Sequence, residues 1–254
     1  MSILRVLQFL EIALCVWAFC FLAAKKAWSD YLGLGVFLAV RASSDVILVA
    51  LRTLAPHIGR TTVYHLYFYA YWAAFALEMV LVLVILYSII QLTMAPLKGL
   101  QSLGGLVFNV VAMVSVVVSM WQAFAPSMKL TGADLLITAV SQIQRTESVL
   151  VLCILLFLTF AMQAMGLSLR SRPFGVVLGL GLMGTNDLVQ TAVLAFRPNV
   201  STGYAMFNGV LFCGILSLWM AYFAMPEPER QELPADSPLR RWDKQCLEYR
   251  RQMI

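Results

Sequence analysis

Charged residues are scarce in this sequence. They make up 12% of its 254 residues, while 61% are hydrophobic; a soluble domain is typically about 25% charged and about 45–50% apolar. So small a polar fraction cannot cover a water-exposed surface. The composition therefore excludes a soluble globular protein and predicts a protein embedded in a lipid bilayer.

The usual catalytic and metal-binding residues are equally scarce. The chain has two histidines, His57 and His65, and it lacks the G-x-S-x-G, H-E-x-x-H and phosphate-loop motifs. A multi-histidine metal hydrolase is therefore not expected. The last apolar run contains no lysine, which excludes a retinal Schiff base of the microbial rhodopsin type. We expect no enzymatic activity, no metal and no cofactor.

Cysteine gives no signal for a disulfide or a metal site. The chain has no C-x-x-C spacing, and four of its five cysteines lie within apolar runs. We therefore interpret them as small apolar residues.

Long apolar runs, in contrast, are abundant. Each has the roughly 20 residues or more that a helix needs to cross a bilayer, and prolines, glycines or charged residues separate them. This pattern predicts an all-α polytopic membrane bundle of about seven transmembrane helices over residues 1–225, followed by a tail over residues 226–254. The first run contains Glu11 and lacks a clean cleavage site, so we expect a retained helix and not a signal peptide. The predicted helices are Ile3–Ala24, Tyr31–Leu54, Val63–Leu92, Leu106–Phe124, Ile137–Leu169, Gly175–Phe196 and Thr202–Met225.

Lysine and arginine near the ends of these runs orient the bundle. Five lie on the side of the amino terminus and eleven on the opposite side, six of the eleven in the tail. The positive-inside rule then places the amino terminus outside and the carboxyl terminus in the cytoplasm. We expect a multi-pass protein of the bacterial inner (plasma) membrane. Because the basic residues mark helix ends, the net charge of +5 does not indicate nucleic-acid binding.

Several ionisable residues lie inside the apolar runs, where lipid makes them costly. One such group at mid-membrane costs about 2.5–3.5 kcal/mol, so these side chains are expected to face the bundle interior, pair or line water. They are Glu11, Arg41, Asp45, Glu78, Arg145, Glu147 and Asp187.

The spacing of these residues suggests pairs and a common layer. Arg41 and Asp45 are four residues apart and share a helix face. Glu78 shares a face with Tyr71, so it can accept hydrogen bonds from tyrosines. The alternatives are that it pairs with Arg41 or Arg145 across the bundle, or that desolvation keeps it protonated. The polar positions lie roughly 9–20 Å below the predicted outer helix ends. The candidate ligand- or ion-binding residues are Glu11, Arg41, Asp45, Tyr71, Glu78, Arg145, Asp187 and Asn208.

Two interpretations of this layer remain open. It either lines a cavity that is open to the outside and plugged below by aliphatic helix halves, or it is a closed network that only fixes the helices. The aromatic run over residues 64–72 is similarly ambiguous, because such rings form an interfacial belt or wall a pocket. The glycines Gly175 and Gly179 predict close helix packing, within one bundle in preference to a dimer.

The tail carries a second pattern. From Ser237 onward apolar residues recur at helical spacing among basic ones, which predicts a short amphipathic helix on the inner leaflet. Docking on a cytoplasmic partner is the alternative. The residues expected at this surface are Arg240, Arg241, Trp242, Lys244 and Arg250.

Two stretches resemble a family of seven-helix membrane proteins of soil-type bacteria such as acidobacteria. The first is Tyr67–Trp72 together with Glu78, and the second is Gly166–Arg170 followed by Phe174–Leu182. The resemblance implies seven helices and brings no activity or site residue with it.

These patterns support three hypotheses for function. The first is a sensor or receptor-like protein that binds a small ligand in the outward polar pocket and signals through the tail. The second is an ion- or proton-coupled transporter or channel subunit. The third is a non-catalytic subunit of a larger membrane complex.

Overall fold

The computed structural model describes residues 3–25, 28, 30–123, 133–161, 167–196, 201–228 and 237–252. Within these residues all regular secondary structure is helical, which confirms the all-α prediction. Seven helices of 22 to 34 residues precede a short one of 15 residues. The helices are α1 (Ile3–Ala24), α2 (Leu32–Ile58), α3 (Arg60–Thr93), α4 (Lys98–Ala123), α5 (Ala133–Ala161), α6 (Arg172–Phe196), α7 (Ser201–Ala224) and α8 (Pro238–Gln252).

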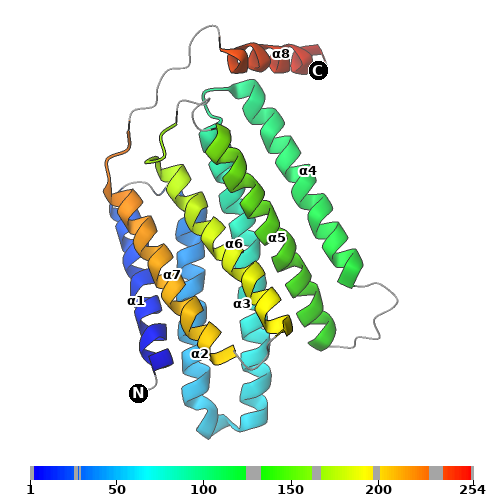
Figure 1. Cartoon of the computed structure of the whole chain (residues 1–254). Helices are drawn as coiled ribbons and strands as arrows, with labels where there is room; N and C mark the ends of the chain where they lie inside the picture. Colours follow the sequence, from blue (N-terminus) through cyan, green and yellow to red (C-terminus); the bar gives the residue numbers. More distant parts are fainter. Residues whose placement is uncertain are drawn as a thin grey trace.

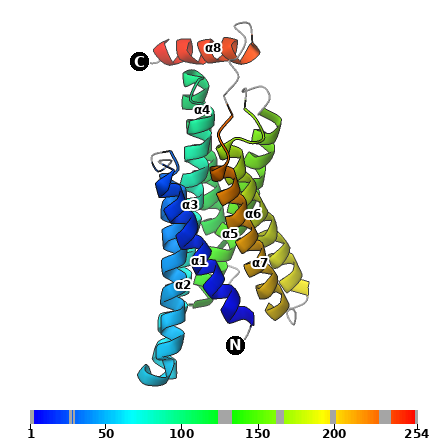
Figure 2. The ribbon, with the colours of Figure 1, turned by 90° about the vertical axis from the view of Figure 1, so that its left-hand side faces the viewer.

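The seven long helices run alternately up and down, and α8 lies across the upper end of the bundle (Figure 1). The amino terminus lies at the lower end. Helices α1, α2, α3, α5, α6 and α7 form a ring: α1 packs against α2 and α7, α2 against α3, and α6 against α5 and α7, while α3 contacts α5 and α6. Figure 2 shows α1 and α7 side by side, which closes this ring. Helix α4 lies outside it, against α3, α5 and α8.

Five of the helices are long and apolar enough to cross a membrane, namely α1, α2, α3, α5 and α7. Their length and composition support a bilayer environment. Helices α4 and α6 have comparable lengths of 26 and 25 residues.

Several helix boundaries differ from the predicted ones. Helix α4 begins at Lys98, eight residues early, because the glycines expected to break it lie inside the helix. Helix α2 continues through Pro56 to Ile58 and ends at Gly59, whose positive φ of 97° suits glycine. The expected end of the fifth helix at Leu169 is wrong: residues 167–170 are not helical, and the Ser168 hydroxyl accepts a hydrogen bond from the Arg170 N–H.

The apolar core fills the upper half of the ring. Its fully buried side chains include Phe37 of α2, Leu86 of α3, Val176 of α6 and Trp219 of α7. Each lies in the half of its helix nearer α8, because odd-numbered helices ascend and even-numbered ones descend. Glu11, Asp187 and Asn208 lie in the opposite halves of their helices, and Arg41 lies at the border of the core, next to Ala42.

Glycines of α6 bring α7 close to it. A Cβ added at Gly175 would overlap the Tyr222 ring, and one at Gly179 would overlap the Trp219 indole. The Trp219 Nε1–H donates to the Val176 carbonyl at 3.3 Å. These contacts confirm that this glycine pair serves packing within one bundle.

Candidate functional site

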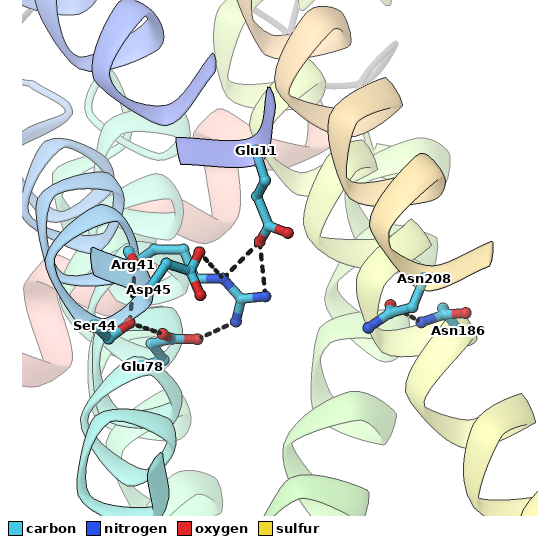
Figure 3. A network of polar contacts seen from close by, with 7 residues as sticks. All are labelled: Glu11, Arg41, Ser44, Asp45, Glu78, Asn186 and Asn208. Atoms are coloured by element: carbon cyan, nitrogen blue, oxygen red, sulfur yellow. Dashed lines mark hydrogen bonds and ion pairs between the residues drawn. The ribbon is translucent and has the colours of Figure 1, made fainter. Parts of the chain in front are cut away.

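Arg41 is the centre of an ionic network in the ring (Figure 3). From α2, its Nη1 donates to Glu78 Oε2 of α3 at 2.7 Å, and its Nε and Nη2 donate to Glu11 Oε1 of α1 at 3.1 and 3.0 Å. Asp45 Oδ2, one turn below on α2, lies 4.0 Å from Arg41 Nε. The Arg41–Asp45 pair that the spacing predicted within α2 is thus the longest of these contacts. The pairing of Glu78 with an arginine across the bundle is confirmed.

The two inter-helix partners of Arg41 are buried. Glu11 is 9% exposed and Glu78 is 8% exposed. The Ser44 hydroxyl approaches Glu78 Oε1 at 3.4 Å, and the Arg41 guanidinium also lies 4.8 Å from the Phe212 ring centre. One guanidinium thereby fastens α1, α2 and α3 to each other and contacts α7. Removing one partner of such a buried pair typically costs about 3–5 kcal/mol, because the other charge stays behind.

A second polar cluster joins α6 to α7 (Figure 3). Asn186 Nδ2 donates to Asn208 Oδ1 at 2.7 Å, and the Tyr204 hydroxyl lies 2.6 Å from Asn186 Oδ1. Asn186 and Tyr204 are both buried. Sequence reasoning missed Tyr204, although it lies four residues before Asn208 and so on the same face of α7.

A cavity of about 620 Å³ separates the two clusters. Side chains of all six ring helices line it, whereas no described side chain of α4 does. Seven of the eight candidate residues lie on its wall: Glu11, Arg41, Asp45, Tyr71, Glu78, Asp187 and Asn208. The polar layer is therefore both a network and a cavity lining.

Arg145 is the exception among the candidates. Its side chain is exposed and does not line the cavity, whereas Glu147 on the same helix does. Residues two apart on a helix differ by about 200° in direction, so only one of this pair can face the ring interior. The expectation that Arg145 belongs to the polar layer is wrong, and Glu147 takes its place.

Aromatic rings of α3 form one wall of the cavity. Tyr67, Tyr71 and Phe75 follow each other at intervals of one turn, with ring planes within 7° of parallel. All three line the cavity, whereas Tyr64 and Tyr69 are 66% and 63% exposed. The aromatic run thus supplies both a pocket wall and exposed rings.

The polar partners of these rings differ from those predicted. Within the described residues, no tyrosine donates to Glu78. Instead Arg52 donates to the Tyr67 hydroxyl, and its guanidinium lies 5.0 Å from the centre of the Tyr67 ring. Arg52, assigned from sequence only to a helix end, also lines the cavity.

The tail helix α8 is attached to the bundle through Asp243. Its Oδ1 accepts hydrogen bonds from the backbone N–H groups of Gly99 and Leu100, at 2.7 and 3.1 Å, and so caps the start of α4. Four of the five side chains predicted at the tail surface are exposed, namely those of Arg240, Arg241, Trp242 and Lys244. The side chain of the fifth, Arg250, is outside the described part of the structure.

Comparisons with protein-family models, curated proteins and solved structures found no match. Among the described residues, no three His, Cys, Asp or Glu side chains are placed to hold a metal ion. The fold and the site define the chain as an α-helical bundle with an internal charged cavity, and five of its described helices are long and apolar enough to span a membrane.

Proposed function

We propose that this chain is a seven-helix sensor or receptor-like protein that binds a small ligand in the cavity within its ring. The cavity is the observation that carries the proposal. Its volume of about 620 Å³ lies within the range of about 300–1,000 Å³ typical of small-molecule sites. A purely structural network has no need of such a space.

The position of the cavity supports a receptor more than a transporter or channel. Polar residues line the lower half of the ring, while the apolar core around Phe37, Leu86 and Trp219 fills the upper half. A ligand that enters from below therefore meets a plug and no path through the bundle. In the proposed orientation the lower end faces outside, and α8 lies at the cytoplasmic surface of the bacterial inner membrane.

Seven spans follow in this proposal if α4 and α6 cross the bilayer as well. At about 1.5 Å per residue, helices of 25 and 26 residues exceed the roughly 30 Å hydrocarbon core. An odd number of spans puts the two termini on opposite sides, as the lysine and arginine distribution requires. The resemblance to the bacterial seven-helix family stays a prediction, and it too implies seven membrane-spanning helices.

Transport is the second candidate, because a buried ionic network beside a cavity is also suited to ion or proton coupling. It predicts pH-dependent flux in proteoliposomes that carry the parent protein. Glu78→Gln would abolish that flux, and Arg145→Gln, which changes an exposed residue of α5, would leave it intact. Proteoliposomes without flux favour the receptor or a subunit of a complex.

Cysteine labelling tests whether the cavity is open to the outside. Ala74 lines the cavity, and its neighbour Ala73 is exposed on the outside of the bundle at the same depth. We expect a membrane-impermeant thiol reagent added to intact cells to label Ala74→Cys. It should spare Ala73→Cys, because a thiol in hydrocarbon stays protonated and unreactive.

The parent protein, with its five native cysteines, supplies the background for this assay. If Ala74→Cys folds but is not labelled by the reagent, the open pocket is refuted. Equal labelling of Ala73→Cys and Ala74→Cys would show that α3 is not embedded in lipid there.

A further inference from the structure

The chemistry of the cavity wall identifies a class of ligand, on the assumption that the proposed pocket binds one. We propose that the ligand is an organic cation: an ammonium or similar group that carries an apolar portion. The argument combines the charges on the wall, the aromatic rings of α3 and the size of the space.

The wall carries more negative than positive groups. Five carboxylates and two guanidinium groups line the cavity, which leaves a formal surplus of three negative charges when all are ionised. The carboxylates belong to Glu11, Asp45, Glu78, Glu147 and Asp187, and the guanidinium groups to Arg41 and Arg52. A bound cation offsets part of this surplus, whereas an anion adds to it.

Both arginines of the wall already have partners within the protein. Arg41 already donates three hydrogen bonds to Glu11 and Glu78, and Arg52 is held on the face and hydroxyl of Tyr67. In contrast, Glu147 makes no hydrogen bond or ion pair with any other described residue, although it lines the cavity. Glu147 therefore offers a carboxylate to a ligand that carries a positive charge.

The aromatic side of the cavity is suited to a cation as well. The protein's own guanidinium groups already lie on two cavity rings, Arg52 on Tyr67 and Arg41 on Phe212. Further along the same wall, Tyr71, Trp72 and Phe75 line the cavity. Aromatic faces attract ammonium groups, and quaternary ammonium ligands are characteristically bound in this way.

The size of the cavity points to an organic ligand and not to a bare metal ion. A volume of about 620 Å³ is that of a small-molecule site. The end nearest the apolar core is lined by Phe37, Val82 and Ile215. A ligand with its cationic group among the carboxylates and aromatic rings would place its apolar portion against these residues.

Two thiol reagents of opposite charge test this inference on full-length protein in membranes. Trimethylammonioethyl and sulfonatoethyl methanethiosulfonate attach to the same cysteine at comparable size. For Ala74→Cys we expect the ratio of cationic to anionic labelling rates to exceed that of a free thiol in solution at least tenfold. Glu147→Gln in the same protein should lower this ratio by about threefold or more, because it removes one of the wall charges.

Protection by small probes completes the test. Benzyltrimethylammonium should slow the labelling of Ala74→Cys at concentrations where benzenesulfonate and the neutral benzyl alcohol have no effect. Gly203→Cys, in an exposed position with open space near the lower end of α7, is the control and should be labelled equally with and without the probe.

The outcomes separate this inference from the proposed function. If Ala74→Cys is labelled by both reagents at the free-thiol ratio, the pocket stands and the cationic ligand is refuted. A high ratio without protection by benzyltrimethylammonium means that the cavity is negatively charged but binds no organic cation, which also overturns the inference. If neither reagent labels Ala74→Cys, the open pocket itself fails.

Discussion

At the scale of single residues, Arg41 accounts for how this bundle keeps carboxylates in an apolar surrounding. Its guanidinium group satisfies Glu11 on α1 and Glu78 on α3 with hydrogen bonds of 2.7 to 3.1 Å. The planar, always charged guanidinium can bind two carboxylates at once, which a lysine ammonium does less well. The network therefore depends on this residue more than on any one of the acids.

Replacement of Arg41 should destabilise the protein strongly. We expect Arg41→Met to lower the free energy of unfolding by about 3–5 kcal/mol, because it leaves buried carboxylates without a counter-charge. Arg145→Met is the matched control, since Arg145 is an exposed arginine, and it should change stability by less than about 1 kcal/mol. Thermal unfolding in nanodiscs measures both, and equal losses would contradict the network.

The sequence was sufficient to find most of these residues but not to pair them. Rarity made Glu11, Arg41 and Glu78 conspicuous within apolar runs, since lipid penalises each of them. It did not distinguish Arg145 from Glu147, because a spacing of two places them on opposite faces without saying which face points inward. That choice depends on how α5 is rotated against α3 and α6, which only tertiary packing determines.

At the scale of helices, the contact of α6 with α7 depends on small residues. Gly179→Val would force a side chain into the Trp219 indole, and overpacking of this kind typically costs about 1–3 kcal/mol. Gly214→Ala is the control, because nothing lies within 4 Å of a Cβ added there. We expect Gly179→Val to lower the melting temperature and Gly214→Ala to leave it unchanged or higher; a neutral Gly179→Val would contradict this packing.

The docking of α8 should depend on the Asp243 carboxylate. Asp243→Ala removes the acceptor for two N–H groups at the start of α4, a loss of about 0.5–2 kcal/mol for a helix cap. Hydrogen exchange at Gly99 and Leu100 should therefore become faster. Asp243→Asn, which keeps an acceptor oxygen, should retain most of the protection, and Glu248→Ala at an exposed position should have no effect. Unchanged exchange in Asp243→Ala would show that α8 docks by other contacts.

Helix α4 illustrates what periodicity does not reveal. Its residues predicted a helix, which the structure contains over Lys98–Ala123. They did not predict that this helix lies outside the ring. Much of it faces outward, with Met113 and Trp121 70% and 77% exposed. No ionisable residue interrupts the helix after Lys98, and this is the one sequence feature that agrees with its absence from the cavity wall.

At the scale of the whole molecule, the ring divides into an apolar upper half and a polar lower half. The sequence predicted this division from helix depth alone, because most of the ionisable residues lie toward the predicted outer ends. It left open whether they enclose a space, since a cavity of about 620 Å³ depends on how far apart the packed ring helices lie. No residue pattern encodes that separation directly.

A double-mutant cycle between Arg41 and Glu78 tests most directly whether the buried charges are turned toward each other across the bundle. Unfolding free energies of the parent, Arg41→Met, Glu78→Gln and the double variant give the coupling between the two residues. The geometry predicts a coupling of about 1–3 kcal/mol, as for residues in one buried network. Effects that add to within about 0.5 kcal/mol would place the two side chains apart and contradict the account.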